Sequence, residues 1–341
     1  MIAVEYHTDL EQVQSDPALA ALLGDEAQAA PFDRLAWWQA LARHCDLPPV
    51  LAVARHGAEC AVLPLAGKGR EMTALANWYT FRIRPIATPD ANRPALFAAL
   101  AADLARRCDR LQLNPLPGED GSAAELQAAF RSTGWLVAAS PCDTNRFLKV
   151  NGRSAAEYCE DLPGPLRTTL RRKAGRLEIE IHPEFRPDIW AEYEAVYAAS
   201  WKPVEGAPAF LRDFAAAEGA AGRLRLGIAR LERQAVAAQL WTVEGGTAFI
   251  HKLAHRLEFD GLSPGTVLTA ALMEHVIDRD RVALVDFGTG DDPYKRDWMN
   301  GVRPRWRLQA WRRQVPANWP GIGGALIKQA ARRLAGEAGR G

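Results

Sequence analysis

The stretch 285-VDFGTGDDPYKRDW-298 is the most informative part of this sequence. Apolar residues precede it and predict a buried strand, whereas glycines, aspartates, a tyrosine and a lysine follow within a few positions. Loops that follow strands often carry function, and this one gathers residue types that chemistry uses. The stretch therefore predicts a functional loop at the end of a strand.

Three familiar loop types do not fit this stretch. A methyltransferase cofactor loop has a similar strand-DxGxG pattern, but it stands at the start of a doubly wound sheet, and too few βα units follow here. The kinase DFG motif requires an HRD-type loop and a glycine-rich loop upstream, which the sequence lacks. A calcium loop requires alternating ligands and a glutamate at its twelfth position, and Asp286, Asp291 and Asp292 do not provide that spacing.

Length and composition place limits on the remaining possibilities. The chain has 341 residues, of which 48% are hydrophobic and 24% charged, so two globular domains are expected. The formal net charge of +1 gives no overall attraction for nucleic acid or membranes. The five cysteines form no CxxC pair, which predicts a reduced, cytoplasmic protein without a cysteine zinc site. The first residues do not resemble a signal peptide, and no stretch reaches the ~20 apolar residues of a membrane span.

A second motif precedes the loop. Ser263, Pro264, Gly265 and Thr266 open a predicted helix directly after a predicted strand. Free N–H groups and a partial positive charge at a helix N-terminus attract anions, and a glycine there allows a phosphate to approach the main chain. The equivalent helix of the first half opens with residues 90–94, DANRP, without a glycine. The structural alternative is an ordinary serine cap followed by a first-turn proline.

The two motifs together resemble a known family. The segment 252-KLAHRLEFDGLSPGTVL-268, followed by 282-VALVDFGTGDDPYKRDW-298, is similar to the C-terminal module of GNAT-like acyltransferases. More narrowly, it resembles the group associated with cellulose biosynthesis and related to the Fem-like peptidyltransferases. The shared features are SPG opening a helix, D-x-G-x-G-x-x-x-Y-K closing the next strand, and an earlier Ser-Trp-Lys. In the first half the resemblance rests on Pro31-Phe32, Trp37-Trp38 and Leu63-Pro64-Leu65, and overall it covers roughly residues 30–312.

The resemblance implies an α/β (α+β) fold of two tandem GNAT-like modules, each a mixed, mostly antiparallel sheet flanked by helices. The expected domains are an N-terminal module without a cofactor loop (1–150), a C-terminal catalytic module (151–320) and a helical tail (321–341). In the catalytic module, a fourth strand at about 247–255 and a fifth at 282–287 would diverge. Acetyl-CoA or another acyl-CoA would lie in the gap as co-substrate, with its pyrophosphate on Ser263, Pro264, Gly265 and Thr266.

The same resemblance suggests roles for the loop residues. Tyr294 would be the acid that protonates the leaving thiolate, Lys295 would hold an anionic group or stabilise an oxyanion, and Asp286 would be a base or an anchor for Lys295. Each has a structural alternative: a packing tyrosine, a solvated lysine and a turn cap. Trp201, Lys202 and His251 are the expected substrate-binding residues. His251 and His255 would lie about 13 Å apart on a strand, too far to share a metal, and no metal site is expected.

Donor and acceptor remain alternatives at this level. The expected acceptor is a small-molecule or cell-envelope precursor amine bound between the modules. The SPG turn departs from the longer glycine pattern of ordinary GNAT modules, which keeps open a Fem-like transferase that uses aminoacyl-tRNA. The sequence has no long helical hairpin to hold tRNA, although Arg167, Arg171, Arg172, Lys173 and Arg176 form a basic helix that could contact it or be a solvated face. A non-catalytic partner protein with the same fold is a third alternative.

Overall fold

A computed structural model of the chain describes residues 1–325 and Ile327. It divides into two units, which we describe separately: unit 1 contains Met1–Thr144 and the chain from Arg303 onward, and unit 2 is Asn145–Val302. The sequence placed residues 303–320 in the second module, whereas this division places them in unit 1. The expected tail, 321–341, lies mostly outside the described residues.

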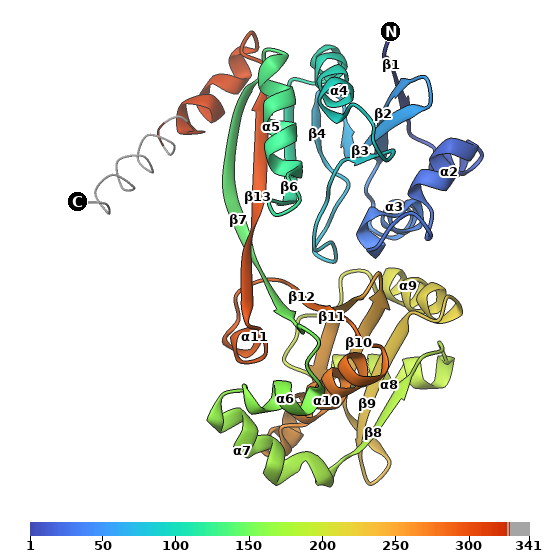
Figure 1. The fold of residues 1–341 in the computed structure, drawn as a ribbon, viewed down its shortest axis with the longest axis vertical. Helices are drawn as coiled ribbons and strands as arrows, with labels where there is room; N and C mark the ends of the chain where they lie inside the picture. Colours follow the sequence, from blue (N-terminus) through green and yellow to red (C-terminus); the bar gives the residue numbers. More distant parts are fainter. Residues whose placement is uncertain (326, 328–341) are drawn as a thin grey trace. The chain divides into compact units, whose positions relative to one another are not determined.

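The first unit is a mixed sheet with helices packed on it (Figure 1). Its strand order is β1-β2-β3-β4-β6-β13-β7, with the short β5 paired to β3. The strands are β1 (Ala3–His7), β2 (Pro49–His56), β3 (Glu59–Lys68), β4 (Glu71–Ala74), β5 (Ile86–Ala87), β6 (Arg110–Pro117), β7 (Leu136–Lys149) and β13 (Gly301–Trp311). The helices are α1 (Leu10–Gln14), α2 (Pro17–Leu23), α3 (Leu35–His44), α4 (Arg93–Arg107) and α5 (Ser122–Ser132).

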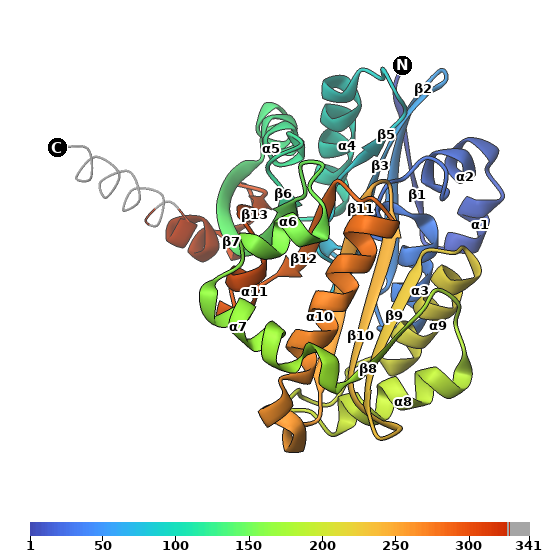
Figure 2. The ribbon, with the colours of Figure 1, turned by 60° about the horizontal axis from the view of Figure 1, so that its bottom comes forward.

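The second unit is also a mixed sheet, with the order β12-β11-β10-β9-β8 continued by the last residues of β7. Its strands are β8 (Glu178–His182), β9 (Leu224–Leu231), β10 (Gln234–Glu244), β11 (Thr247–His255) and β12 (Leu284–Thr289). Its helices are α6 (Ala155–Glu160), α7 (Gly164–Lys173), α8 (Pro187–Ala198), α9 (Pro208–Ala220), α10 (Pro264–Glu274) and α11 (Pro293–Trp298). Figure 2 shows α10 lying along β9 and β10, which it contacts.

Both units repeat one topology, which confirms the expected fold class. In each, four antiparallel strands end at a parallel pair, and a helix connects the two parallel strands. The pair is β4 with β6 in unit 1, connected by α4, and β11 with β12 in unit 2, connected by α10. A further antiparallel strand then follows, β13 beside β6 and β7 beside β12. The chain therefore contains two tandem modules of GNAT type.

The final strand of each unit comes from the other half of the chain. β7 follows β6 in sequence, yet its last residues pair with β12, and β13 follows β12, yet it pairs with β6. Local composition does not predict this exchange. Residues 141–149 include Pro, Asp and Asn but form a strand, and residues 303–311 belong to a strand that lies between β6 and β7. In both cases long-range pairing overrides local composition.

The hairpins of unit 2 are joined by two-residue loops with positive φ. Glu232 and Arg233 have φ of 48° and 71°, the left-handed pair that joins β9 to β10, and Gly245 and Gly246 have φ of 53° and 71° between β10 and β11. Two-residue loops with positive φ match the right-handed twist of the strands they connect. Gly227 on β9 matters for packing, because a Cβ there would lie 2.8 Å from Leu272 of α10. This close approach seats α10 on the sheet.

Each unit has its own apolar core. The unit 1 core is centred on α4, whose buried Leu96, Phe97 and Leu100 pack on the sheet. In unit 2 the core includes Leu268, Leu272 and Trp241. Among the described helices, none combines the length and apolarity needed to cross a membrane.

Candidate acyl-transfer site

The site begins where β11 and β12 separate. The two strands pair in parallel at only three positions, from Thr247 opposite Leu284 to Phe249 opposite Asp286. Beyond this point β11 continues to His255 and β12 to Thr289 without further pairing to each other. The predicted fourth strand matches β11 in its bounds. The predicted fifth strand, 282–287, overlaps β12 but begins and ends two residues earlier. A gap between diverging strands leaves backbone groups available to a ligand.

Helix α10 begins beside this gap. Ser263 is its N-cap residue with φ of 51° and ψ of 49°, a left-handed conformation, and its side chain makes no capping hydrogen bond to the helix. Pro264 occupies the first helical position, where its missing N–H costs nothing. The N–H groups of Gly265 and Thr266 follow, and the first turn of a helix offers them no intrahelical acceptor. The turn therefore presents main-chain donors and the positive end of the helix dipole.

Gly265 lies close to β11 and holds the first turn of α10 in place. A Cβ at this position would lie 3.1 Å from Nδ1 of His255, so the helix start approaches β11 more closely than most side chains would allow. Its carbonyl oxygen also accepts hydrogen bonds from Gln239 Nε2 and Thr269 Oγ1, both at 3.0 Å. The buried amide of Gln239 thus fixes the first turn of α10 from β10.

The equivalent helix of unit 1 is closed by its own side chain. Asn92 caps α4 and accepts a hydrogen bond from the N–H of Ala95 at 3.2 Å. At the start of α10, Ser263 Oγ instead accepts a hydrogen bond from Lys173 Nζ at 2.8 Å. The contrast agrees with the sequence-based expectation that an anion would be bound by the second module and not by the first.

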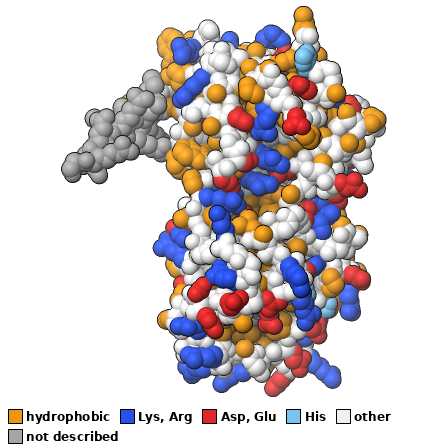
Figure 3. Space-filling model, viewed as in Figure 1, with side chains coloured by type: hydrophobic (Ala, Val, Ile, Leu, Met, Phe, Trp, Pro, Cys, Tyr) orange, Lys and Arg blue, Asp and Glu red, His pale blue; other side chains and the backbone are white. Residues whose placement is uncertain are grey.

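Lys173 was not singled out from the sequence. It is the last residue of α7, within the basic run that was interpreted as a solvated face or a tRNA contact. Arg167, Arg171, Arg172 and Arg176 of that run are exposed, and Figure 3 shows Lys and Arg side chains gathered at the end of unit 2 where α7 lies. Lys173 alone is half-buried and turns toward the helix start. A cation beside free helical N–H groups adds to the attraction for an anion.

A cavity of about 440 Å³ occupies the gap and lies entirely within unit 2. Its lining comes from β11, β12, the start of α10, α11 and the loop after α8, and consists of Trp201, Lys202, Leu253, His255, Asp260, Ser263, Gly265, Thr266, Phe287, Asp292, Tyr294 and Lys295. The structure thus brings together most of the side chains selected from the sequence. Pro264, Asp286 and His251 are the three selected residues that do not line it.

Tyr294 reaches the cavity from α11. Its hydroxyl oxygen lies 2.8 Å from Thr269 Oγ1 and 3.4 Å from the carbonyl oxygen of Gly265. Thr269 uses its own hydrogen toward Gly265, so the phenol is the donor in the shorter contact. Burial raises the pKa of Tyr294 to about 12. The phenol is therefore neutral at physiological pH and acts as a donor.

Lys295 is held at the end of β12. Its Nζ donates a hydrogen bond to the carbonyl of Thr289 and lies 5.3 Å from the ring centre of Phe287, a cation–π arrangement. Gly290, beside Nζ, has φ of 97°, a backbone conformation that favours glycine. The position is a fixed positive charge at the cavity wall.

Asp286 lies behind the cavity. It is 3% exposed, and its Oδ1 accepts hydrogen bonds from Asn145 Nδ2 at 2.6 Å and from the N–H of Gly288 at 2.8 Å. Asn145 also donates to the carbonyl of Gly288 at 2.8 Å. These contacts fix the bend at the end of β12, where Gly288 has φ of 67°. Together with Asn145 of β7, Asp286 holds the bend at the end of β12 in place. It does not line the cavity, so this geometry does not place it as a base.

His251 also lies outside the cavity. Its Nε2 is 2.8 Å from Thr242 Oγ1, and its ring packs edge-on against Phe214 with centroids 4.9 Å apart. His255, four residues further along β11, is the histidine that lines the cavity. Its Nε2 lies 2.6 Å from Asp260 Oδ1, and its ring centroid is 4.6 Å from that of Trp201.

Lys202 belongs to the loop after α8 and lines the cavity. Burial lowers the pKa of its ammonium, and the neighbouring Lys252 lowers that pKa further. A lysine with a lowered pKa exchanges protons at lower pH than an exposed one. In the part of the chain that the structure describes, no group of three or more His, Cys, Asp or Glu side chains could hold a metal ion.

Comparison with known sequence families agrees with this geometry. Residues 165–296 match the family described as "Acetyltransferase (GNAT) domain". This segment is therefore similar to a GNAT domain. It contains the diverging strands, the open helix start and Tyr294, and it supports the expectation that the protein is an acyltransferase. A search of curated proteins found no match.

Solved structures extend the likeness over both units at the level of the fold. The C-terminal DUF2156 domain of a lysylphosphatidylglycerol synthetase candidate from Agrobacterium fabrum aligns with a TM-score of 0.60 and 14% identity, covering 96% of this chain and 98% of that one. FemX aligns with a TM-score of 0.57 and 10% identity, over 89% and 96% of the chains. A tandem GNAT protein from the clavulanic acid biosynthesis pathway gives 0.51 and 14%, over 91% and 98%.

Proposed function

We propose that this protein is an N-acyltransferase that moves an acyl group from acyl-CoA to a primary amine. The observation that carries the proposal is the 440 Å³ cavity between β11 and β12, which meets the open N-terminus of α10. A gap between parallel strands accommodates an extended pantetheine arm, and a helix start with free amides suits a diphosphate. Both are on the same side of unit 2, within one continuous cavity.

The diphosphate would rest on the N–H groups of Gly265 and Thr266. Lys173, already bonded to Ser263, would add a positive charge beside it. Gly265 fits this use because the absence of a Cβ leaves the backbone open on the cavity side. No metal is required for this contact, since the helix dipole and one ammonium supply the positive field.

The reaction itself is a direct transfer. The neutral amine nitrogen attacks the thioester carbonyl carbon, the C–S bond breaks as the amide C–N bond forms, and the amine loses one proton while the thiolate gains one. Tyr294 is placed to donate a hydrogen bond to the sulfur as charge develops there. Lys202, with its lowered pKa, and the His255–Asp260 pair are the cavity groups available to receive the amine proton. Lys295 would stabilise negative charge at the end of β12.

An alternative donor is aminoacyl-tRNA. The fold-level likeness to FemX and to a lysylphosphatidylglycerol synthetase candidate favours it, as does the exposed basic face of α7. The GNAT-domain match over residues 165–296 and the formed gap favour acyl-CoA. Membership of the cellulose-biosynthesis-associated group, a cell-envelope amine as acceptor and a cytoplasmic location are further parts of this proposal.

Calorimetry with acetyl-CoA, longer acyl-CoAs, CoA and charged tRNA tests the proposal. We expect saturable binding of the CoA ligands that competes with CoA itself, and no such binding in a variant with Gly265→Val, where a branched side chain enters the turn. Saturable binding of charged tRNA together with flat traces for every CoA ligand would support the alternative donor. Flat traces for both classes would leave the non-catalytic partner protein as the better description.

A further inference from the structure

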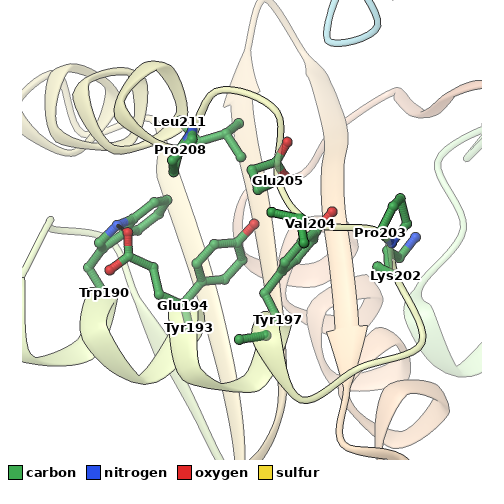
Figure 4. Close-up of a pocket in the computed structure, with 11 residues that line it drawn as sticks. Trp190, Tyr193, Glu194, Tyr197, Lys202, Pro203, Val204, Glu205, Pro208 and Leu211 are labelled. Atoms are coloured by element: carbon green, nitrogen blue, oxygen red, sulfur yellow. Dashed lines mark hydrogen bonds between the residues drawn. The ribbon is translucent and has the colours of Figure 1, made fainter.

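A second cavity, of about 330 Å³, lies beside the first in unit 2 (Figure 4). It forms between α8 and the segment that leads into α9. Its lining residues are Trp190, Tyr193, Glu194, Tyr197, Ala198, Lys202, Pro203, Val204, Glu205, Pro208 and Leu211. Nothing in the acyl-transfer site described above uses this cavity, apart from one shared residue.

One wall of the second cavity is an aromatic row. Trp190, Tyr193 and Tyr197 follow one another along one face of α8, with spacings of three and four residues. Trp190 and Tyr193 stack with centroids 4.6 Å apart, and Tyr193 and Tyr197 lie 6.3 Å apart. Seven residues of helix span about 10 Å, so the row suits a flat or extended apolar body of that length. Aromatic faces also attract ammonium groups.

The charged groups of the cavity favour a cation. Glu194 is exposed at the Trp190 end, and its Oε1 accepts a hydrogen bond from Trp190 Nε1 at 2.9 Å. Glu205 lies toward the other end and pairs with Lys252 at 2.7 Å. Lys252 compensates Glu205, whereas Glu194 forms no ion pair within the residues that the structure describes, so it adds a negative charge to the aromatic end. An acidic acceptor would meet repulsion there, whereas an ammonium or another donor would be attracted.

Lys202 connects the two cavities, since it lines both of them. Figure 4 shows it at the end of the second cavity opposite Trp190. The chain from Trp201 to Glu205 therefore separates a space shaped for the thioester from a space lined by aromatic rings. A molecule extended along α8 would have one end at Lys202, beside the acyl group, and its other end at Glu194.

We propose that the second cavity holds the acceptor, and that the acceptor is a primary amine on an apolar or aromatic body about 10 Å long. Its reacting nitrogen lies at the Lys202 end, and a second ammonium or hydrogen-bond donor meets Glu194. Long aliphatic diamines and arylalkylamines share this chemistry. The assignment of this molecule as acceptor rests on the proposed acyl transfer, but its binding does not.

Calorimetry with 1,8-diaminooctane, 2-phenylethylamine, ethylenediamine and glutamate tests the site in the full-length protein. We expect 1,8-diaminooctane and 2-phenylethylamine, which both have an apolar body, to bind at least tenfold more tightly than ethylenediamine, which lacks one, and glutamate to bind most weakly. Glu194→Lys should weaken 1,8-diaminooctane at least tenfold, and Glu194→Gln about threefold, with little effect on 2-phenylethylamine. Glu194→Gln keeps a side-chain acceptor for the buried Trp190 Nε1, whereas Glu194→Lys removes it, so the folded fraction of Glu194→Lys is measured by urea unfolding before binding is compared. Glu184→Lys, a charge reversal at an exposed glutamate outside the cavity, should have no effect.

The outcomes separate this proposal from the proposed reaction. If 1,8-diaminooctane binds equally well to the wild type and to Glu194→Lys, or if glutamate binds best, the acceptor assignment is wrong even when acetyl-CoA binds. If 1,8-diaminooctane and 2-phenylethylamine bind as expected but acetyl-CoA does not bind, the cation site stands and the acyl-CoA reaction fails. Loss of amine binding in Glu184→Lys as well would show a general charge effect and overturn the site.

Discussion

Replacing Tyr294 with phenylalanine should lower kcat by roughly 5–30-fold and leave acetyl-CoA affinity within about twofold. With a pKa of about 12, the phenol is a far weaker acid than a thiol with a pKa near 8.5, so complete transfer of its proton to the thiolate is uphill by about 5 kcal/mol. Its contribution is then a hydrogen bond to the developing thiolate, worth about 2–3 kcal/mol. To reach the sulfur, the hydroxyl must give up its 2.8 Å hydrogen bond to Thr269, and this loss reduces the gain by about 1 kcal/mol. The net of about 1–2 kcal/mol gives the stated range.

The assay is release of the CoA thiol in the presence of 1,8-diaminooctane, with donor affinity measured separately by calorimetry. Tyr158→Phe is the matched control, because Tyr158 is 3% exposed and donates to the carbonyl of Trp298 at 2.6 Å, outside the cavity. It should cost stability and spare kcat in the folded fraction. The pH profile of kcat in the wild type should show no limb from Tyr294 below about pH 10. A loss of a thousandfold or more in Tyr294→Phe would mean that the phenol transfers its proton fully, against this reasoning.

Three further predictions concern the surroundings of the site and the ion pair between Glu119 and Arg305 in unit 1. Lys173→Ala should weaken CoA by roughly 5–30-fold, since a nearby charge is worth about 1–2 kcal/mol, and titration at several salt concentrations should show a shallower dependence than in an Arg172→Ala control. Asn145→Ala should lower the free energy of unfolding in urea by about 2–3 kcal/mol, because it leaves the buried Asp286 carboxylate short of a donor; an unchanged midpoint would contradict that role. Burial raises the pKa of Glu119, but the ion pairs and hydrogen bonds that it forms, chiefly with Arg305 and also with Arg303, together lower it more, so the net pKa is lowered. The stability that Glu119 adds is complete above the unfolded-state pKa of about 4.3 and is lost as pH falls through the lower folded value, so thermal unfolding of Glu119→Gln should depend less on pH below about 4 than that of the wild type.

Much of the fold follows from local signals in the sequence. The glycine pair at 245–246 and the proline at the start of α10 favour the backbone geometry found there. The turn at Glu232 and Arg233 also lies where the strand pattern predicts it, although both residues have positive φ, which non-glycine residues disfavour. The strand exchange does not follow, because the partners of β7 and β13 lie far away in sequence. Alternation in residues 301–311 resembles an edge strand, but Arg305 is fully buried and donates to Glu119 and to the carbonyl of Phe81.

The candidate site shows the same division. Gly265, Thr266 and Tyr294 were identifiable because local motifs carry them, and the structure brings them to one cavity. Asp286 has the sequence position of a catalytic carboxylate, but only the structure reveals Asn145, 141 residues away, as its partner. Lys173 was obscured among neighbouring cations, and its inward direction depends on where α7 ends. Their roles in the reaction remain predictions.

The exchange of β7 and β13 affects how the protein is made. A ribosome that has released the first 144 residues has produced most of unit 1, yet the strand that borders β6 is not synthesised until residue 311. Until then one side of β6 presents unpaired N–H and C=O groups, a template for pairing with another nascent chain. Neither half should therefore fold cleanly when expressed alone, whereas two co-expressed fragments cut in the segment between β7 and α6 should rescue each other by supplying the missing strands.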